Sequence, residues 1–138
     1  MKRAFLTTLL ILTAGCLHSA RADTLMVTVQ SFNFAPNALT IQLGDTVHWK
    51  YVNGSHTVTS GTGPGDPNVG ALFNSPISAG AQNFFYTFAD TAGVYNYHCT
   101  PHSFLGMTGS VTVEEPITVG IPAYDPDQSW SDLKQLFR

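Results

Sequence analysis

Alternating apolar and polar positions predict β-strands near the start of the chain. Leu25, Val27 and Val29 occupy every second position, and the same period returns between residues 39 and 43. Every second side chain of a strand points to one face of the sheet, so each segment has one apolar face to bury. We therefore expect two half-buried strands here.

A third strand is predicted after the turn at Gly44-Asp45. Val47, Trp49 and Tyr51 alternate with polar residues, which places the aromatic side toward the core. His48 belongs to the opposite face and is expected to point outward. Since Gly and Asp are favoured in turns, the apolar segments on either side are expected to be separate strands.

The rest of the pattern predicts an all-β fold. Short strands are expected at residues 57–59, 83–88, 94–99 and 109–114. The segment 61–81 is rich in glycine and proline, which predicts loops around one short element. About seven short strands without alternating helices indicate a two-sheet β-sandwich of antiparallel character.

The first 22 residues are typical of a secretory signal peptide. Met1 to Arg3 is cationic, residues 4–17 are apolar and uncharged, and Ala20-Arg21-Ala22 supplies small residues before a cleavage position. The apolar run is shorter than the ~18 residues that span a bilayer. We therefore expect residues 1–22 to be removed and residues 23–115 to form one exported domain, with the periplasm as its compartment.

A second interpretation of the leader concerns Cys16. The segment from Leu12 to Cys16 resembles a lipoprotein processing site, although Thr13 stands where a bulky aliphatic residue is usual. A diacylated cysteine would anchor the chain to a membrane. Membrane association is expected only if Cys16 is lipidated.

The C-terminal extension, residues 116–138, differs in composition from the rest. Three prolines interrupt regular structure there, and a helix cap is available at Asp127 or Ser129. Four apolar residues then recur at helical spacing: Trp130, Leu133, Leu136 and Phe137. The extension therefore predicts a short amphipathic helix that packs on the sandwich, with docking to another protein as the alternative.

Composition and charge narrow the classes of function. Charged residues make up 11% of the chain and hydrophobic residues 43%, which favours a folded protein over disorder. Without the leader, three basic residues face nine acidic ones, a net charge of −6. Nucleic-acid binding needs clustered lysine and arginine, so this class is excluded.

Candidate metal ligands lie close together near residue 100. Cys99 is followed by His102 and Met107, and His56 lies on an upstream loop. With Cys16 in the leader, Cys99 has no internal disulfide partner, and an unpaired thiol in an oxidising compartment needs a reason such as metal binding. Two histidines, one thiolate and a weak axial thioether describe a type 1 copper site. We predict one copper ion that alternates between Cu(II) and Cu(I).

Other interpretations of these residues are weaker. Cys99 could be a small buried residue with no ligand, but the added histidines and methionine disfavour that. Zinc is disfavoured because methionine rarely binds it. All positions of the predicted site are filled, whereas metal-assisted hydrolysis needs an open position, so we do not expect an enzyme. His98 points opposite to Cys99 and is expected at the surface.

Several motifs resemble the cupredoxin family, the small type 1 (blue) copper proteins of the plastocyanin and pseudoazurin sort. They are the Cys-Thr-Pro-His-x4-Met loop of residues 99–107, the upstream His56, and the Phe-Asn-Phe-x-Pro and Gly-Asp-x-Val-x-Trp segments at residues 32–36 and 44–49. The resemblance covers about residues 25–114 and implies a Greek-key β-sandwich, one copper, and electron shuttling between larger redox proteins. Thr57 departs from plastocyanins, which have asparagine directly after the first histidine ligand. Its hydroxyl is expected to make a similar but shorter tie between the ligand loops.

The resemblance also implies a docking surface at His102. Pro101, Phe104, Leu105 and Gly106 surround this residue with apolar groups. In the family the imidazole edge lies in such a patch and touches the partner, so transient redox partners are expected to dock near His102. Whether Phe104 and Leu105 are exposed stays open. The net negative charge is expected to attract a basic partner.

Two alternative functions share the same ligands. One is a protein that binds and delivers copper, which is disfavoured because only Met26 and Met107 remain after the leader. The other is an accessory copper module of a larger redox complex, which would depend on a partner chain. Both differ from an electron carrier in how readily copper is released or electrons are exchanged.

Overall fold

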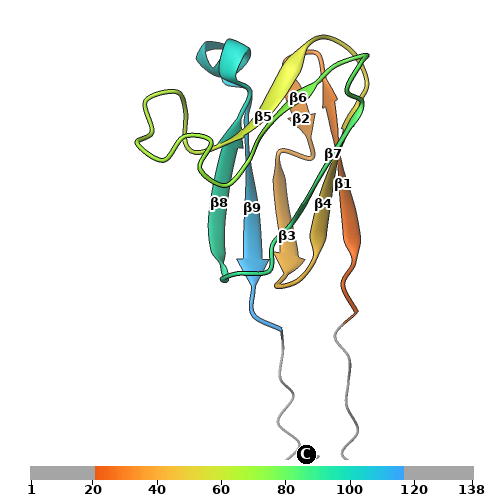
Figure 1. Ribbon diagram of the computed structural model, residues 1–138, viewed down its shortest axis with the longest axis vertical. Coiled ribbons are helices and arrows are strands. Elements are labelled where there is room, and N and C mark those ends of the chain that lie inside the picture. Colours follow the sequence, from red (N-terminus) through yellow and green to blue (C-terminus); the bar gives the residue numbers. More distant parts are fainter. Residues whose placement is uncertain (1–20, 117–138) are drawn as a thin grey trace, which may run out of the picture.

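The computed structural model describes residues 21–116, which form two β-sheets packed face to face (Figure 1). Nearly all of the predicted leader, including Cys16, and the predicted helix around Trp130 lie outside the described residues. Within residues 21–116, no helix is both long and apolar enough to cross a membrane.

The first sheet has the strand order β2-β1-β4-β7, and the second β3-β9-β8-β5-β6. The strands of the first sheet are β1 (Thr24–Gln30), β2 (Asn33–Ala35), β4 (Thr46–Tyr51) and β7 (Asn83–Thr87). Those of the second are β3 (Ala38–Gln42), β5 (His56–Ser60), β6 (Asn74–Ile77), β8 (Gly93–His98) and β9 (Thr108–Glu114). A 3-10 helix, η1 (Thr100–Leu105), lies at one end of the sandwich, opposite the end where the described chain begins and finishes (Figure 1).

The all-β sandwich is confirmed, with one correction to strand direction. β1 pairs with β4 and β3 pairs with β9 in parallel, whereas the other strand pairs are antiparallel. The expectation of antiparallel character is wrong for these two pairs. Between β1 and β4 the chain crosses to the second sheet and forms β3 there. It therefore returns to the first sheet as β4, which runs beside β1 in the same direction.

The predicted inward face of the early strands is buried. Val27, Val29, Val47 and Trp49 have no exposed surface. Aromatic side chains meet between the sheets, where the ring of Tyr97 lies 5.3 Å edge-on from that of Trp49. Burial of these large rings removes much apolar surface from water, which stabilises the sandwich and makes a rigid base for the loops at its end.

His48 points away from the core, as predicted, but it is not simply solvated. Its Nε2 lies 2.8 Å from the Asn83 Oδ1 atom on the neighbouring strand. Its ring also stacks on Phe85 at 4.1 Å. These two cross-strand contacts give His48 a structural role on the outer face of the first sheet.

Tyr97 makes folding stability sensitive to high pH. Burial raises the pKa of Tyr97 to about 12 from a usual value of 10.0. Below pH 10 both folded and unfolded chains keep the proton, whereas between pH 10 and 12 the unfolded chain loses it first. We expect the free energy of unfolding to fall by roughly 3 kcal/mol across that interval.

The measurement is denaturant unfolding at a series of pH values, with Tyr97→Phe as the control. The Tyr97 hydroxyl has no hydrogen-bond partner within 3.5 Å among the described residues, so its removal should not weaken the fold. A pH dependence equally steep in Tyr97→Phe would contradict the assignment.

Candidate metal centre

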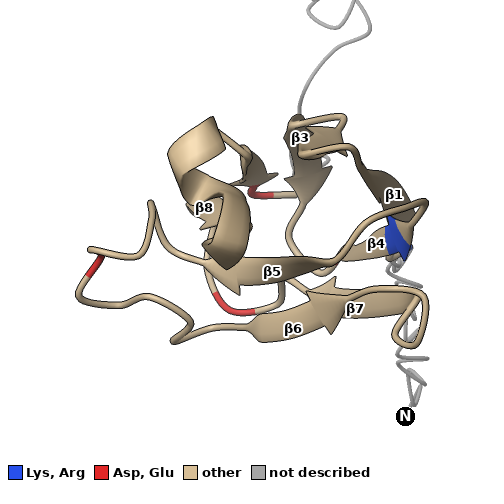
Figure 2. Cartoon of the chain, turned by 90° about the horizontal axis from the view of Figure 1, so that it is seen from above, with Lys and Arg blue, Asp and Glu red and all other residues tan. Residues whose placement is uncertain are grey.

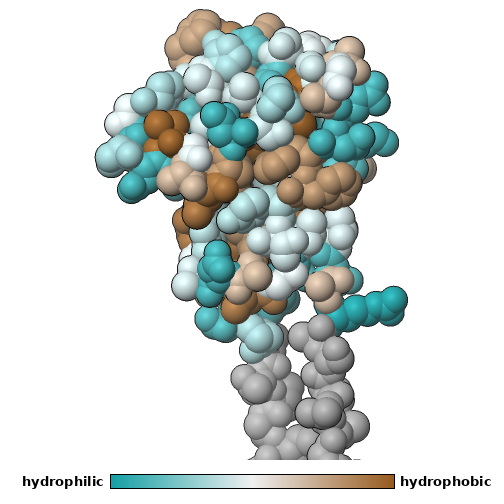
Figure 3. Space-filling model, viewed as in Figure 1, coloured by the Kyte–Doolittle hydropathy of each residue, from teal (hydrophilic) through white to brown (hydrophobic). Residues whose placement is uncertain are grey.

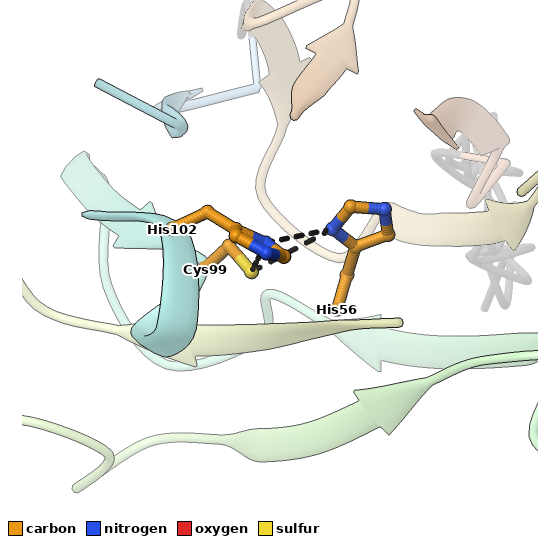
Figure 4. A group of neighbouring side chains, drawn as sticks. All are labelled: His56, Cys99 and His102. Carbon is orange, nitrogen blue, oxygen red and sulfur yellow. Dashed lines mark hydrogen bonds between the residues drawn. The ribbon is translucent and has the colours of Figure 1, made fainter. Parts of the chain in front are cut away.

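Three of the predicted ligands converge at the end of the sandwich that carries η1. His56 begins β5, Cys99 follows β8, and His102 lies in η1 (Figure 4). Their candidate ligand atoms all lie within 4.8 Å of one another. The His102 Nδ1 atom lies 3.2 Å from the His56 Nδ1 atom and 3.3 Å from the Cys99 Sγ atom, and Cys99 Sγ lies 3.8 Å from His56 Nδ1. The two nitrogens and the sulfur therefore face one small volume.

Local backbone structure brings His102 and Met107 back to Cys99. Pro101 lies in the first turn of η1, where its missing N–H costs no helical hydrogen bond. The His102 N–H donates to the Cys99 carbonyl at 3.1 Å, and Gly106 ends the helix in the left-handed conformation with φ of 79°. The Cys99 N–H then donates to the Met107 carbonyl at 3.0 Å. Met107 is thus a neighbour of the cluster, with its side chain buried.

Hydrogen bonding fixes the tautomer of His56. Its Nε2 atom lies 3.0 Å from the Asn53 carbonyl, which can only accept, so Nε2 carries the proton. The Nδ1 lone pair is left to face the cluster. Burial lowers the pKa of His56, and the charge of His102 lowers it further. The hydrogen bond to the Asn53 carbonyl raises the pKa, but the net shift is downward. His56 is therefore held in the neutral form that binds metals.

Comparison with known proteins gives the same chemistry from independent observations. A model of copper binding proteins, plastocyanin/azurin family, matches residues 22–114. The chain belongs to the plastocyanin/azurin family of copper-binding proteins, the cupredoxins. Its cofactor is copper, and like its relatives it is an electron carrier rather than an enzyme.

Individual cupredoxins match over most of the domain. The plastocyanin of Prochlorothrix hollandica is 33% identical over 115 residues, which cover 77% of this chain and 88% of the relative. The amicyanin of Paracoccus versutus is 34% identical over 96 residues, which cover 67% of each chain. The structure of oxidised plastocyanin from Dryopteris crassirhizoma aligns with a TM-score of 0.55 and 25% identity, covering 65% of this chain and all of that one. The all-β cupredoxin fold is thus confirmed.

The donor set of this cupredoxin fits copper. Cys99 supplies a soft sulfur donor, and both histidines direct Nδ1 toward it. Carboxylates, which harder cations prefer, are absent from the three-residue cluster. The residues present therefore agree with the metal that the family binds.

Thr57 makes the tie that its position predicts. The Thr100 N–H donates to the Thr57 hydroxyl at 2.8 Å, which joins the start of β5 to the residue after Cys99. The Thr57 N–H in turn points at Cys99 Sγ at 3.4 Å. A short hydroxyl side chain therefore links the two ligand loops where plastocyanins have asparagine.

His98 is not at the surface, and the prediction for it is wrong. Its side chain has no exposed area, and its Nδ1 lies 3.1 Å from the Gly61 carbonyl. The loop after β5 covers this side of β8, so an outward-pointing strand position becomes an interior one. Alternation along β8 predicts the direction in which the His98 side chain points, but it does not predict that the loop after β5 covers that side.

Two residues near the histidines were not predicted. The Phe32 ring lies edge-on to His102 at 4.6 Å, and Phe32 adopts a left-handed backbone with φ of 63°. Asn53 accepts from His56 through its carbonyl and from the Ser31 N–H through Oδ1 at 2.9 Å. It thus joins the turn that carries Phe32 to the loop that carries His56. Only the family motif at residues 32–36 draws attention to this turn in the sequence.

The surface around His102 is apolar and uncharged. Phe104 and Leu105 are 80% and 55% exposed, which decides the question that the sequence left open. η1 carries no charged side chain, although the long loop beside it carries an acidic one (Figure 2). Residues 31–32 and 53–56, which line the hollow at His102, include neither lysine or arginine nor aspartate or glutamate. In the space-filling view, tan groups lie at this end beside white and pale blue ones, and the browner, more hydrophobic groups lie mostly below it (Figure 3). Neighbouring exposed apolar side chains of this kind are suited to contact with another molecule.

Proposed function

We propose that this cupredoxin carries single electrons between larger redox proteins in an exported compartment, with a type 1 copper held by four side chains: His56, Cys99, His102 and Met107. The observation that carries the proposal is the convergence of one thiol and two imidazole Nδ1 atoms within 4.8 Å. The position of Met107 beside Cys99 supports a fourth, thioether donor. The apparent leader, residues 1–22, supports export.

When bound, copper supplies a one-electron couple; the rest of the chemistry is done by the protein. The sandwich holds the donor atoms together through its own hydrogen bonds, so a change of oxidation state need not move them. Asn53 keeps the proton of His56 on Nε2, away from the metal side. Burial of Cys99 and Met107 keeps water from the sulfur donors. A site with four protein donors leaves no position for a substrate.

The test is a copper titration of the protein without residues 1–22. We expect one copper per chain, an intense thiolate-to-copper charge-transfer band in the visible spectrum, and reversible loss of this band on one-electron reduction. Zinc should bind without colour and should be displaced by copper. Colourless copper-loaded protein, or copper that is released on each reduction, would overturn the proposal; release on reduction would favour copper delivery instead.

The proposal includes transient docking of redox partners at the apolar face around His102. This face brings a ligand ring near the surface, and redox encounters use small interfaces. Electron self-exchange between oxidised and reduced copies tests the face without a known partner. We expect Phe104→Asp to slow self-exchange at least about tenfold, because two like charges would then meet at the contact.

The control for this experiment is Val94→Asp. Val94 is 64% exposed at the start of β8, away from η1, and the substitution makes the same change in net charge. It should leave self-exchange close to that of the unmodified protein. Equal slowing by both variants would mean that net charge, not the face around His102, controls the rate.

A further inference from the structure

A group of polar side chains lies behind the proposed copper ligands, on the side of β5 and β6. The Thr59 hydroxyl is the centre of this group: it lies 3.0 Å from the Thr57 hydroxyl, 3.0 Å from the Asn74 Oδ1 atom and 3.1 Å from the Thr100 hydroxyl. Thr59 is only 2% exposed. A buried hydroxyl with three polar neighbours on three different segments is more than a solvated surface residue.

Proton counting gives this group a direction. The Thr59 hydroxyl is the donor toward both the Thr57 hydroxyl and the Asn74 Oδ1 atom, so its one proton is shared between these two acceptors. The Thr59 oxygen is free to accept, and the Thr100 hydroxyl donates to it. Thr59 therefore accepts from η1 and donates to β5 and β6.

This direction has a consequence for Thr57. The Thr57 oxygen accepts two hydrogen bonds, one from the Thr59 hydroxyl and one from the Thr100 N–H at 2.8 Å. Because the Thr59 hydroxyl itself accepts from the Thr100 hydroxyl, it is a stronger donor to Thr57. The backbone next to Cys99 is therefore held through Thr57 and Thr59, and Asn74 on β6 helps to orient the Thr59 hydroxyl.

We infer that Thr59 is a positioning residue of the metal centre: it orients the hydroxyls of Thr57 and Thr100, and through them holds Cys99 in register with His56. The inference rests on the proposed function, since it concerns the same ligands. Thr57 lies between these two ligands: its N–H points at Cys99 Sγ at 3.4 Å, and it directly follows His56 in the chain. Without the Thr59 hydroxyl, the hydroxyls of Thr57 and Thr100 would turn toward other partners. Cys99 would then be held less firmly beside His56.

The experiment compares Thr59→Val, which keeps the shape but removes the hydroxyl, with Thr59→Ser, which restores it. Thr40→Val is the matched control, because Thr40 is an exposed threonine on β3 of the same sheet. The readouts are the affinity for copper, the energy of the charge-transfer band, the reduction potential, and the unfolding of the metal-free protein.

We expect Thr59→Val to bind copper about tenfold more weakly and to shift both the band and the potential. Thr59→Ser and Thr40→Val should match the unmodified protein. Asn74→Ala removes the second acceptor of the Thr59 proton at an exposed position; it should also shift the band, and it decides the question if Thr59→Val does not fold.

A weakened fold with unchanged affinity, band and potential would show that Thr59 is merely structural and would overturn the inference. Failure of the proposed function is a different result, since the unmodified protein would then lack the charge-transfer band altogether.

Discussion

Replacing Cys99 by serine should abolish the visible charge-transfer band and weaken copper binding by more than about 100-fold. A serine hydroxyl does not ionise at neutral pH and is a hard oxygen donor, whereas the cysteine thiolate is both charged and soft. The proposed donors that remain are two imidazoles and one thioether, which are neutral. The charge that balances a cupric ion is thereby lost from the centre.

The fold itself should survive this change. Cys99 is fully buried, but the hydroxyl of serine can accept from the Thr57 N–H, which lies 3.4 Å from Cys99 Sγ. Absorption spectroscopy and copper titration are the measurements, with thermal unfolding of the metal-free protein beside them. Ser103→Ala is the control, because Ser103 lies in η1 and, within residues 21–116, its hydroxyl bonds only to the helix backbone, at the Thr100 carbonyl. A visible band that persists in Cys99→Ser would assign the colour to another group.

The second large effect is expected from Gly109→Ala, which should destabilise the fold by about 3 kcal/mol. Gly109 on β9 pairs directly with Tyr97 on β8. A methyl group at Gly109 would overlap the end of the Tyr97 ring. This ring cannot move aside easily, because it is 1% exposed and packs on Phe34 at 4.8 Å and on Trp49.

Urea unfolding of the metal-free protein measures the effect, and Gly80→Ala is the control. A methyl group at Gly80 would have nothing within 4 Å and the backbone there is not left-handed, so its stability should change little. In a Tyr97→Leu background the penalty of Gly109→Ala should shrink by more than half, since the overlapping atoms are gone. Equal penalties in both backgrounds would show that the ring is not the cause.

Local patterns predicted most of the fold. The period of two at Val27, Val29, Val47 and Trp49 depends only on neighbours in the sequence, so it identified β1 and β4 and their buried faces correctly. β2 was missed because three residues are too few to show a period. The parallel direction of β1 against β4 follows from the path of the chain between the sheets, which no local pattern encodes.

In the candidate site, too, the features set by local spacing were predicted and those set by long-range packing were missed. Cys99, His102 and Met107 lie within one loop whose spacing alone suggested a metal, and the thiol and imidazole of the first two do come together. His98 was misplaced because its cover is the Gly61 backbone, which lies far away in sequence. Thr59 could not be recognised at all, since its partners come from β5, β6 and η1. Burial and polar networks depend on long-range packing, whereas ligand spacing does not.

The placement of η1 at the end opposite residues 21 and 116 has a practical consequence (Figure 1). Any tether joined to either end of the described chain, whether a lipid, a fusion partner or an electrode linker, would leave the copper-bearing tip directed outward. A protein attached in this way could still exchange electrons with a redox partner in solution. The β-sandwich would then separate the copper from the support as an insulating spacer.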